Sequence, residues 1–360
     1  MEAIEIHFAI HDLNETGGQD RSTLEILRRI KSPFRIHAFT LSDKKLHDRL
    51  FAVKPNIGRP VFLKILYFYF VLFFRGNKIW HATGVSHFRS NIVHLQFIHS
   101  SWEKQNSHPF SLRGLYSKVL ALWNIWLEKI CFTPEKTYIA ISKQVAQELK
   151  TEFGIEKNVE IIHHGVDIEK FSPGPSSVRE ELGISPTELC FLFAGSFERK
   201  GLECTLKALA KAEVPATLLV LGEGDFERYQ NLAKDLGLKK VKFLGKQPNV
   251  EKYFRAADVF VLPTQYEPFG LVILEALACG LPVITSKCAG AAELMTDGIE
   301  GYLLEHPKDP TELAKKIQNI SNDREARIKM KEAARKVALN NSWNHVAEKY
   351  DKVLSRFISS

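Results

Sequence analysis

Two hydrophobic patterns take turns along this chain. Short runs rich in Val, Ile, Leu and Phe are typical of strands that are buried on both faces of a parallel sheet. Between these runs lie segments whose apolar residues recur at helical spacing. A regular alternation of such strands and helices predicts an α/β protein with doubly wound layers.

The first run of alternating elements occupies the N-terminal half of the chain. Strands are predicted at residues 4–10, 35–39, 78–81, 92–98, 137–140 and 159–162. Helices are predicted at residues 20–30, 112–132 and 143–153. Ser142 directly precedes the last of these helices, and we expect its hydroxyl to cap the free N–H groups of the first turn.

The second run follows a Pro-, Gly- and Ser-rich segment at residues 171–177, which we interpret as a linker. Strands are predicted at residues 189–193, 217–221, 241–244, 259–262, 283–285 and 301–304. One helix is predicted at 202–212, and more follow from Pro310 onward. Because 360 residues exceed what a single core usually fills, we expect two domains with a boundary after residue 170.

The strongest chemical signal lies in residues 266–275 (Tyr-Glu-Pro-Phe-Gly-Leu-Val-Ile-Leu-Glu). A predicted buried strand precedes this segment, so its Pro-x-Gly turn falls at the carboxyl edge of the sheet, where open α/β sheets bind ligands. The N–H groups of Gly270 and Leu271 open a helix there and would face an anion. Glu275, on the second turn, can accept hydrogen bonds from vicinal ribose hydroxyls. The alternative is that Glu267 and Glu275 are solvated surface charges.

This segment resembles the Glu-x7-Glu motif of the family 4 glycosyltransferases, which are retaining enzymes of the GT-B fold. The resemblance covers most of the chain and is strongest between residues 137 and 343. It implies two Rossmann-like, doubly wound domains that face a central cleft. Residues 1–170 would bind the acceptor, with a last helix at 342–360 that packs back on them. Residues 171–341 would bind the nucleotide sugar.

A second motif, residues 195–201 (Gly-Ser-Phe-Glu-Arg-Lys-Gly), lies directly between a predicted strand and a predicted helix. Arg199 and Lys200 therefore project at the carboxyl edge of the second domain, where an exposed basic helix start is the simpler interpretation. The resemblance implies that both grip the donor diphosphate and stabilise the charge that grows on it. It also implies donor contacts from Gly195 and Phe269.

The N-terminal domain adds further candidates. Gly17 and Gly18 precede a predicted helix, and many turns need glycine for a positive φ. By resemblance they match a glycine loop that approaches the donor phosphate and the acceptor. His99 stands at a predicted strand end, where a histidine is more often an ordinary core or surface residue. By resemblance it matches a histidine that touches the donor hexose.

The residues alone leave the stereochemistry open. An inverting enzyme needs a base near the acceptor, and Asp12, Glu15 or Asp20 could serve. A double displacement needs a carboxylate at the anomeric carbon, for which Glu267 is the nominee. The resemblance implies retention by same-face attack. Glu267 would then bind sugar hydroxyls and stabilise the positive charge that develops on the ring.

Charge adds one feature. The net charge is +7, and no acidic residue occurs between Asp48 and Glu103. Within this interval, residues 61–74 are almost entirely apolar, with basic residues at both ends. They are too short to cross a bilayer, which takes roughly 20 residues. They could form a packed core helix or an interfacial segment that enters anionic headgroups.

No metal or cofactor is expected. The cysteines show no metal-ligand spacing and read as reduced core thiols, and the histidines show no HExxH-like pattern. The chain starts without a secretory signal, so we expect a cytoplasmic protein. No recognised nucleic-acid module surrounds the basic band.

The resulting hypothesis is a metal-independent hexosyltransferase. We expect a UDP-sugar donor, with glucose as the first choice and a GDP-sugar as the alternative. The basic, aromatic first domain favours a membrane-associated anionic acceptor such as lipopolysaccharide core, with peripheral membrane association, and residues 193–201 resemble the corresponding segment of core glucosyltransferases. Two alternatives stay open: a soluble sugar or sugar-phosphate acceptor, and a catalytically silent scaffold subunit.

Overall fold

The chain forms two compact units. The computed structural model describes residues 5–10, 12–13, 18–38, 40–41, 43–52, 78–104 and 112–358. One unit consists of Met1–His164 together with Trp343–Ser360, and the other consists of Gly165–Ser342. The first boundary falls after His164 and not after residue 170. The residues between these two boundaries bond into the second unit, because Arg335 donates to the Ile168 carbonyl (3.0 Å).

The first unit is built on a parallel sheet. In the described part of the chain its strand order is β5 (Leu50–Ala52), β3 (Phe34–Ala38), β1 (Ile6–Ala9), β6 (Ile79–Thr83), β7 (Ile92–Leu95), β8 (Thr137–Ala140) and β9 (Val159–Ile161). A small parallel pair and a 3-10 helix accompany it: β2 (Asp12–Leu13), β4 (Thr40–Leu41) and η1 (Lys44–Arg49).

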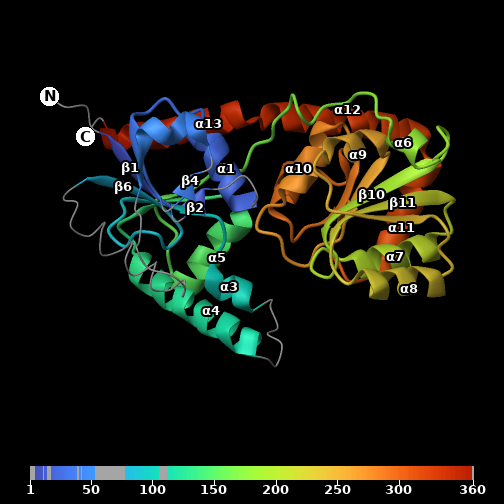
Figure 1. The fold of residues 1–360 in the computed structure, drawn as a ribbon, viewed down its shortest axis with the longest axis horizontal. Helices are drawn as coiled ribbons and strands as arrows, with labels where there is room; N and C mark the ends of the chain where they lie inside the picture. Colours follow the sequence, from blue (N-terminus) through green and yellow to red (C-terminus); the bar gives the residue numbers. More distant parts are fainter. Residues whose placement is uncertain are drawn as a thin grey trace. The chain divides into compact units, whose positions relative to one another are not determined.

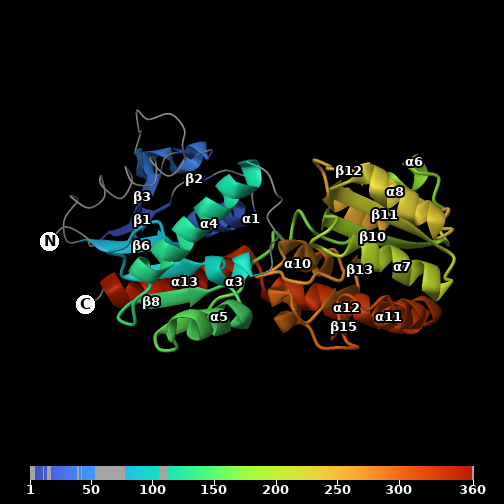
Figure 2. The same ribbon diagram turned by 90° about the horizontal axis from the view of Figure 1, so that it is seen from below.

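Helices cover both faces of this sheet. They are α1 (Gly18–Leu27), α3 (His99–Glu103), α4 (Leu112–Cys131), α5 (Lys143–Phe153) and α13 (Trp343–Ile358). Helices α1 and α13 pack together on one face, and α4 and α5 lie on the other (Figures 1 and 2). The return of α13 to this unit gives the C-terminal end of the chain a place in the first core.

The second unit is a six-stranded parallel sheet. Its strand order is β12 (Val241–Gly245), β11 (Ala216–Glu223), β10 (Leu189–Ser196), β13 (Val259–Leu262), β14 (Val283–Ser286) and β15 (Gly301–Leu304). Its helices are α6 (Val178–Glu181), α7 (Leu202–Ala212), α8 (Phe226–Asp235), α9 (Glu251–Ala256), α10 (Leu271–Ala278), η2 (Gly290–Leu294), α11 (Pro310–Asn322) and α12 (Arg324–Asn340). Figure 1 shows α9, α10 and α12 on one face and α7, α8 and α11 on the other.

Most predicted elements are confirmed, and the α/β class with two doubly wound sheets is as expected. Ser142 caps α5 as predicted, because its Oγ accepts a hydrogen bond from the Val145 N–H (3.2 Å). The strand predicted at 92–98 ends at Leu95, and α3 begins at His99. Helices α8 and α9 are polar on one face and short, and the hydrophobic pattern did not single them out.

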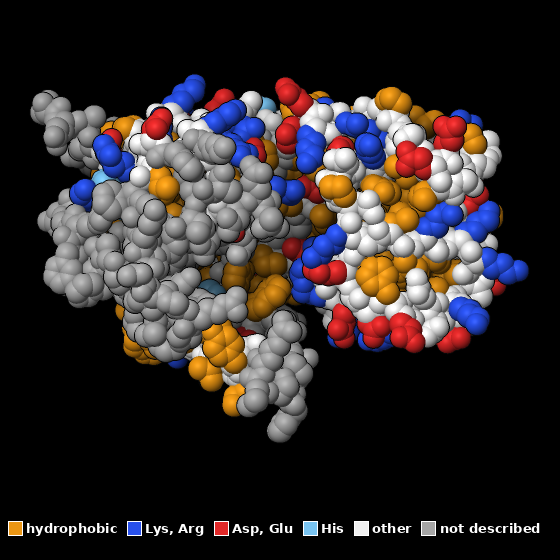
Figure 3. Space-filling model, viewed as in Figure 1, with side chains coloured by type: hydrophobic (Ala, Val, Ile, Leu, Met, Phe, Trp, Pro, Cys, Tyr) orange, Lys and Arg blue, Asp and Glu red, His pale blue; other side chains and the backbone are white. Residues whose placement is uncertain are grey.

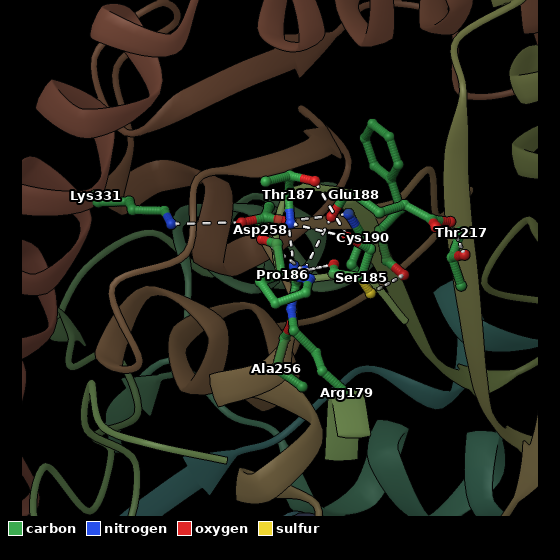
Figure 4. A network of polar contacts seen from close by, with 11 residues as sticks. Arg179, Ser185, Pro186, Thr187, Glu188, Cys190, Thr217, Ala256, Asp258 and Lys331 are labelled. Carbon is green, nitrogen blue, oxygen red and sulfur yellow. Dashed lines mark hydrogen bonds and ion pairs between the residues drawn. The ribbon is translucent and has the colours of Figure 1, made fainter. Parts of the chain in front are cut away.

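A polar network closes the amino edge of the second sheet, opposite the edge where the predicted site lies (Figure 4). Arg179 donates to Asp258 (2.5 Å) and to the carbonyls of Ala256 (2.7 Å) and Glu188 (2.9 Å). Asp258 also accepts from the Cys190 N–H (2.9 Å). These bonds tie the starts of β10 and β13 together and satisfy backbone groups that the strands leave open. The amino edge therefore carries structural charges.

Candidate active site

The second unit has its topological switch point at β10. This strand pairs with β11 on one side and with β13 on the other, so the chain winds outward in two directions from it. The loops that leave the carboxyl ends of β10 and β13 diverge there, which is the usual place for a ligand in an open α/β sheet. The first loop carries Arg199 and Lys200, and the second carries Glu267. The two sequence motifs thus meet at one edge.

Three charged side chains converge at this point. Arg199 donates through Nη1 to Oε2 of Glu267 (3.1 Å), and the Nζ of Lys200 forms an ion pair with the same oxygen. Lys200 and Glu267 are largely shielded, with 9% and 13% of their side chains exposed, whereas 37% of Arg199 is exposed. An anion that approaches from solvent would therefore reach the guanidinium first.

The cations decide the protonation state of Glu267. Burial works to raise the pKa of this carboxyl, but the charges of Lys200 and Arg199 and the hydrogen bonds they donate outweigh it and hold the pKa below its ordinary value. Glu267 is therefore a carboxylate at neutral pH. A buried carboxylate of this kind can accept hydrogen bonds from hydroxyl groups and stabilise a positive charge.

Backbone bonds hold the Glu267 loop in place. The Glu267 N–H donates to the Cys288 carbonyl (3.3 Å), and the Glu267 carbonyl accepts from the Gly290 N–H (2.9 Å). Two hydroxyls at the strand ends add to this, since Ser286 donates to the Thr264 carbonyl and Thr264 lies within reach of the Tyr266 carbonyl (3.3 Å). The sequence analysis missed Thr264 and Ser286, although both directly follow apolar strand runs at this edge.

Two predicted glycines lie directly against the charged side chains. Gly195 has a φ of +139°, and a Cβ added there would stand 3.1 to 3.3 Å from the Lys200 stem. Gly270 has a φ of +93°, and its added Cβ would stand 3.0 Å from Cγ of Glu267. Both conformations disfavour any residue with a side chain. The glycines therefore let Lys200 and Glu267 fold closely over the backbone.

Helix α10 begins beside this cluster. Gly270 is its N-cap and makes no side-chain cap, so the positive end of the helix dipole faces the same edge. Leu271 is its first residue and is partly exposed. Glu275, on the second turn, is only 4% exposed. Phe269 is 2% exposed as a whole residue, and its carbonyl accepts from the Ala291 N–H (2.7 Å).

The other predicted site residues lie in the first unit. Gly18 is the first residue of α1, and Asp20 lies in its first turn. His99 begins α3, with 23% of its side chain exposed. Gly17, Glu15, the Asp12 side chain and residues 61–74 lie outside the described residues.

A buried carboxylate that the sequence analysis missed holds His99. Glu128, on α4, is fully buried and accepts from the backbone N–H groups of His99 (2.6 Å) and Ser100 (3.3 Å). The same carboxylate lies 2.9 Å from Nδ1 of His99. The N-cap residue of α3, Ile98, has no side chain that can cap the helix. Glu128 takes over this role and also orients the imidazole of His99. The available signal was that Glu128 is the only acidic residue in the sequence of α4.

The described residues provide neither a metal site nor a membrane-spanning helix. No group of three or more His, Cys, Asp or Glu side chains in the described ranges is arranged to hold a metal ion. None of the helices in those ranges has the length and apolar character needed to cross a bilayer.

Two family models match the chain, and together they span nearly all of it. The model described as "Glycosyl transferases group 1" matches residues 176–337, and the one described as "Glycosyltransferase Family 4" matches residues 16–170. The first match contains the whole charged cluster of the second unit, and the second contains Gly18 and His99.

Several curated proteins are similar over part of the chain. An uncharacterized glycosyltransferase of Methanocaldococcus jannaschii is 32% identical over 59% of this chain and 55% of its own length. A D-inositol 3-phosphate glycosyltransferase of Corynebacterium jeikeium is 33% identical over 54% of this chain and 51% of its own. An N-acetyl-alpha-D-glucosaminyl L-malate synthase of Bacillus anthracis is 33% identical over 54% and 53%. The chain thus spans about half the length of the curated relatives it matches.

Solved structures show the same fold along nearly the whole chain. WaaG, a glycosyltransferase involved in lipopolysaccharide biosynthesis, is 20% identical, with a TM-score of 0.76 over 97% of this chain and 99% of that one. Anabaena HepE in complex with UDP and glucose is 21% identical, with a TM-score of 0.75 over 98% and 100%. At these identities the likeness concerns the fold alone.

Proposed function

We propose, from the premise that this chain belongs to the glycosyltransferases with the GT-B fold, that it transfers a hexose from a nucleotide diphosphate donor to an acceptor hydroxyl. The acceptor oxygen forms a bond to the anomeric carbon, and the bond from that carbon to the diphosphate breaks. The nucleoside diphosphate leaves with the bonding electrons, and its departing oxygen takes up the proton of the acceptor hydroxyl. The protein must therefore stabilise negative charge on the leaving group and positive charge on the sugar ring.

The single observation that carries this proposal is the convergence of Arg199, Lys200 and Glu267 at the strand switch point of the second unit. In our proposal, the diphosphate takes over the cations that Glu267 now holds. Lys200, shielded from water, neutralises the departing oxygens, and Arg199 binds them from the solvent side. The N–H groups at the start of α10 face the same charge. Protein groups then do what a metal ion does elsewhere, and we propose a metal-independent reaction.

Glu267 is a carboxylate at neutral pH, so it can bind sugar hydroxyls and stabilise the ring as positive charge develops. We adopt retention of configuration, with same-face attack, from the family resemblance. Glu275 is proposed to bind the ribose hydroxyls. Gly18 and His99 are proposed to contribute from the first unit, the histidine through its Nε2, since Nδ1 is engaged by Glu128.

We propose UDP-glucose as the donor and a glycolipid or envelope glycan, such as lipopolysaccharide core, as the acceptor. Support for the donor comes from HepE, whose structure holds UDP and glucose. Support for the acceptor comes from WaaG and from the basic first domain. The reaction would take place at the cytoplasmic face of a membrane, with the protein bound peripherally.

A second candidate acceptor is a soluble sugar phosphate. The observation that favours it is the group of relatives named D-inositol 3-phosphate glycosyltransferases, which are more similar in sequence than the structural neighbours. The donor chemistry at Lys200 and Glu267 would be the same.

The test is a panel of nucleotide sugars without acceptor. UDP-glucose, UDP-galactose, UDP-N-acetylglucosamine and GDP-mannose are compared for thermal stabilisation and for slow hydrolysis. We expect UDP-glucose to give the largest upward shift of the unfolding temperature and the fastest release of UDP. A chain that responds to none of them is a silent scaffold, and the enzymatic proposal is then wrong.

A second experiment tests whether the reaction needs a metal ion. Hydrolysis and transfer are measured with EDTA present and after magnesium is restored. Because Lys200, Arg199 and the start of α10 are proposed to hold the diphosphate, EDTA should leave the rate unchanged. Activity that EDTA abolishes and magnesium restores would contradict this part of the proposal.

A further inference from the structure

Helix α4 exposes many of its large apolar side chains to solvent, which is unusual for a helix at the surface of a protein. Six large apolar side chains on it are between 44% and 62% exposed: Leu115, Tyr116, Val119, Leu122, Trp126 and Ile130. A surface helix normally turns such residues toward the core and its polar face toward water. Figure 3 shows hydrophobic side chains at the surface along the part of the first unit that α4 occupies in Figure 1.

The exposed apolar side chains share one face. They recur at steps of three and four residues, and at 100° per residue they fall within an arc of about 120°. The opposite side of the helix carries Gly114, Ser117, Asn124 and Glu128, of which Gly114 and Glu128 are buried. Large apolar residues thus dominate the outward side of α4, while Leu127 and Cys131 are buried together with Gly114 and Glu128.

Another helix of the same unit shows the usual arrangement. Helix α13 buries its large apolar residues, among them Trp343, Tyr350 and Leu354, and exposes charged ones such as Lys352. The exposed face of α4 is thus not a general property of this unit.

The charges on α4 indicate what covers this face. Lys118 and Lys129 are exposed and lie at one border of the apolar arc. The one acidic residue in its sequence, Glu128, is buried beneath His99. The outward side of α4 therefore combines apolar and aromatic residues with cations and carries no anion. A helix of this composition suits the interface of an anionic bilayer, where aromatic rings enter the headgroup region and lysines meet lipid phosphates.

We propose that α4 is a docking surface for an anionic lipid bilayer. Its apolar face, defined by the six residues above, enters the boundary between headgroups and acyl chains, while Lys118 and Lys129 bind the headgroups. The opposite face of the same helix keeps Glu128 on His99, so docking brings the first unit to the surface that would carry a lipid-linked acceptor. Only this last consequence rests on the proposed function; the docking itself does not.

The experiment measures partition of the full chain to vesicles. Phosphatidylcholine vesicles are compared with vesicles that also contain phosphatidylglycerol, at low and at high salt. We expect binding to the anionic vesicles, weakened by salt because the headgroup attraction is screened. The emission of the tryptophans should shift to the blue on binding, since Trp126 enters a less polar environment.

Matched variants locate the surface. Leu122→Glu and Trp126→Glu should each lower partition at least about tenfold, because each removes a large apolar side chain from the interface. Lys118→Ala and Lys129→Ala should each lower partition to the anionic vesicles about fivefold. Ile299→Glu and Ile328→Glu change side chains in the second unit that are 50% and 49% exposed, and they should leave partition unchanged.

Three outcomes would overturn the proposal. Wild-type protein that stays in solution with anionic vesicles contradicts it directly. Concentration-dependent dimers that Leu122→Glu dissolves would show that a second copy covers the face. Trp126 shielded from a water-soluble quencher before vesicles are added would show that this chain's own residues cover it.

A donor-binding measurement distinguishes failure of the docking proposal from failure of the proposed function. The UDP-glucose thermal shift is measured on the same variants, and none of the substituted residues belongs to the proposed site. Wild-type protein that does not bind anionic vesicles but keeps its donor response overturns the docking surface alone. Vesicle binding without any nucleotide response overturns the enzymatic proposal alone.

Discussion

The two units build the same kind of parallel sheet from different interiors. In the second unit the strands are nearly pure apolar runs, and the charged residues Arg199, Lys200 and Glu267 gather at the carboxyl edge. In the first unit six histidines are at most 5% exposed. His7, His37, His81 and His94 lie on strands of the sheet, and His87 and His164 lie in loops that follow strands. The described part of the second unit buries no histidine. Buried imidazoles are therefore a feature of the first unit, whereas the charged cluster of the second unit lies at the edge of its sheet.

The difference has an energetic meaning. Burial lowers the pKa of His94 to about 3 and holds the pKa of His81 and His164 well below the ordinary value of 6.5, and neighbouring His94 adds to the effect on both. His164 is held by a hydrogen bond with Gln96 (3.0 Å), whereas neither ring nitrogen of His81 has a hydrogen-bond partner among the described residues. We therefore expect acid to act first on the first unit.

The largest expected effect belongs to the charged cluster of the second unit. Lys200→Ala should lower turnover at least about 100-fold, because the leaving diphosphate loses its shielded cation. Turnover is measured as UDP release from UDP-glucose. The control is Lys207→Ala, which removes an exposed lysine paired with Glu203 in the same unit. Near-normal turnover of Lys200→Ala would remove this residue from the site.

Glu275→Gln tests the ribose contact with nearly unchanged side-chain shape. Loss of a charged acceptor should weaken UDP binding by about 10- to 100-fold, and calorimetry measures it. Glu227→Gln, an exposed position on α8, is the matched control. Equal affinity for wild type and Glu275→Gln would show that this carboxylate is structural.

Glu128→Gln extends the comparison to the one buried carboxylate that supports a proposed site residue of the first unit. The carboxylate accepts the hydrogen bonds from the N–H groups of His99 and Ser100 and from Nδ1 of His99 with both of its oxygens. A glutamine side chain has one accepting oxygen, and its NH₂ group can only donate. Turnover should fall about tenfold, the equivalent of one charged hydrogen bond. Nitrogen NMR of His99 should show the Nδ1-protonated form in the wild type and its loss in the variant. Glu152→Gln, which affects an outer ion pair with Lys104, should change neither.

The last prediction concerns stability and not turnover, because acid should destabilise the first unit. The folded state holds His81, His94 and His164 neutral, whereas the unfolded chain binds protons below about pH 6.5. Their contribution to stability is therefore complete above pH 6.5 and is lost as the pH falls. Well below pH 6.5, each of these histidines lowers the free energy of unfolding by about 1.4 kcal/mol for each unit by which the pH falls.

Tryptophan fluorescence can follow the first unit selectively, because all five tryptophans of the chain lie within it. We expect its acid transition to occur at a higher pH than the loss of total helix content seen by circular dichroism. His81→Leu should move the tryptophan transition to lower pH, while His306→Leu, at an exposed position of the second unit, should not. Coincident transitions in the wild type would contradict the proposed difference between the two cores.

Local features of the sequence were sufficient for much of the fold and for part of the site. The apolar run 259–262 predicts a buried strand without knowledge of its neighbours in space. Gly195 and Gly270 have positive φ angles that disfavour any other residue. The position of Arg199 and Lys200 at a strand end follows from the order of strand, loop and helix. These properties depend on neighbours along the chain, so the sequence by itself determined them.

Tertiary structure decided which groups meet and which faces remain exposed. Glu128 reaches His99 across 29 positions, and Arg199 reaches Glu267 across 68, because strands and helices distant in sequence become neighbours in the sheet layers. The sequence predicted α4 only as a helix, and packing decided that a face of large apolar residues points outward. An amphipathic pattern defines two sides of a helix, and only the rest of the fold determines which side it covers.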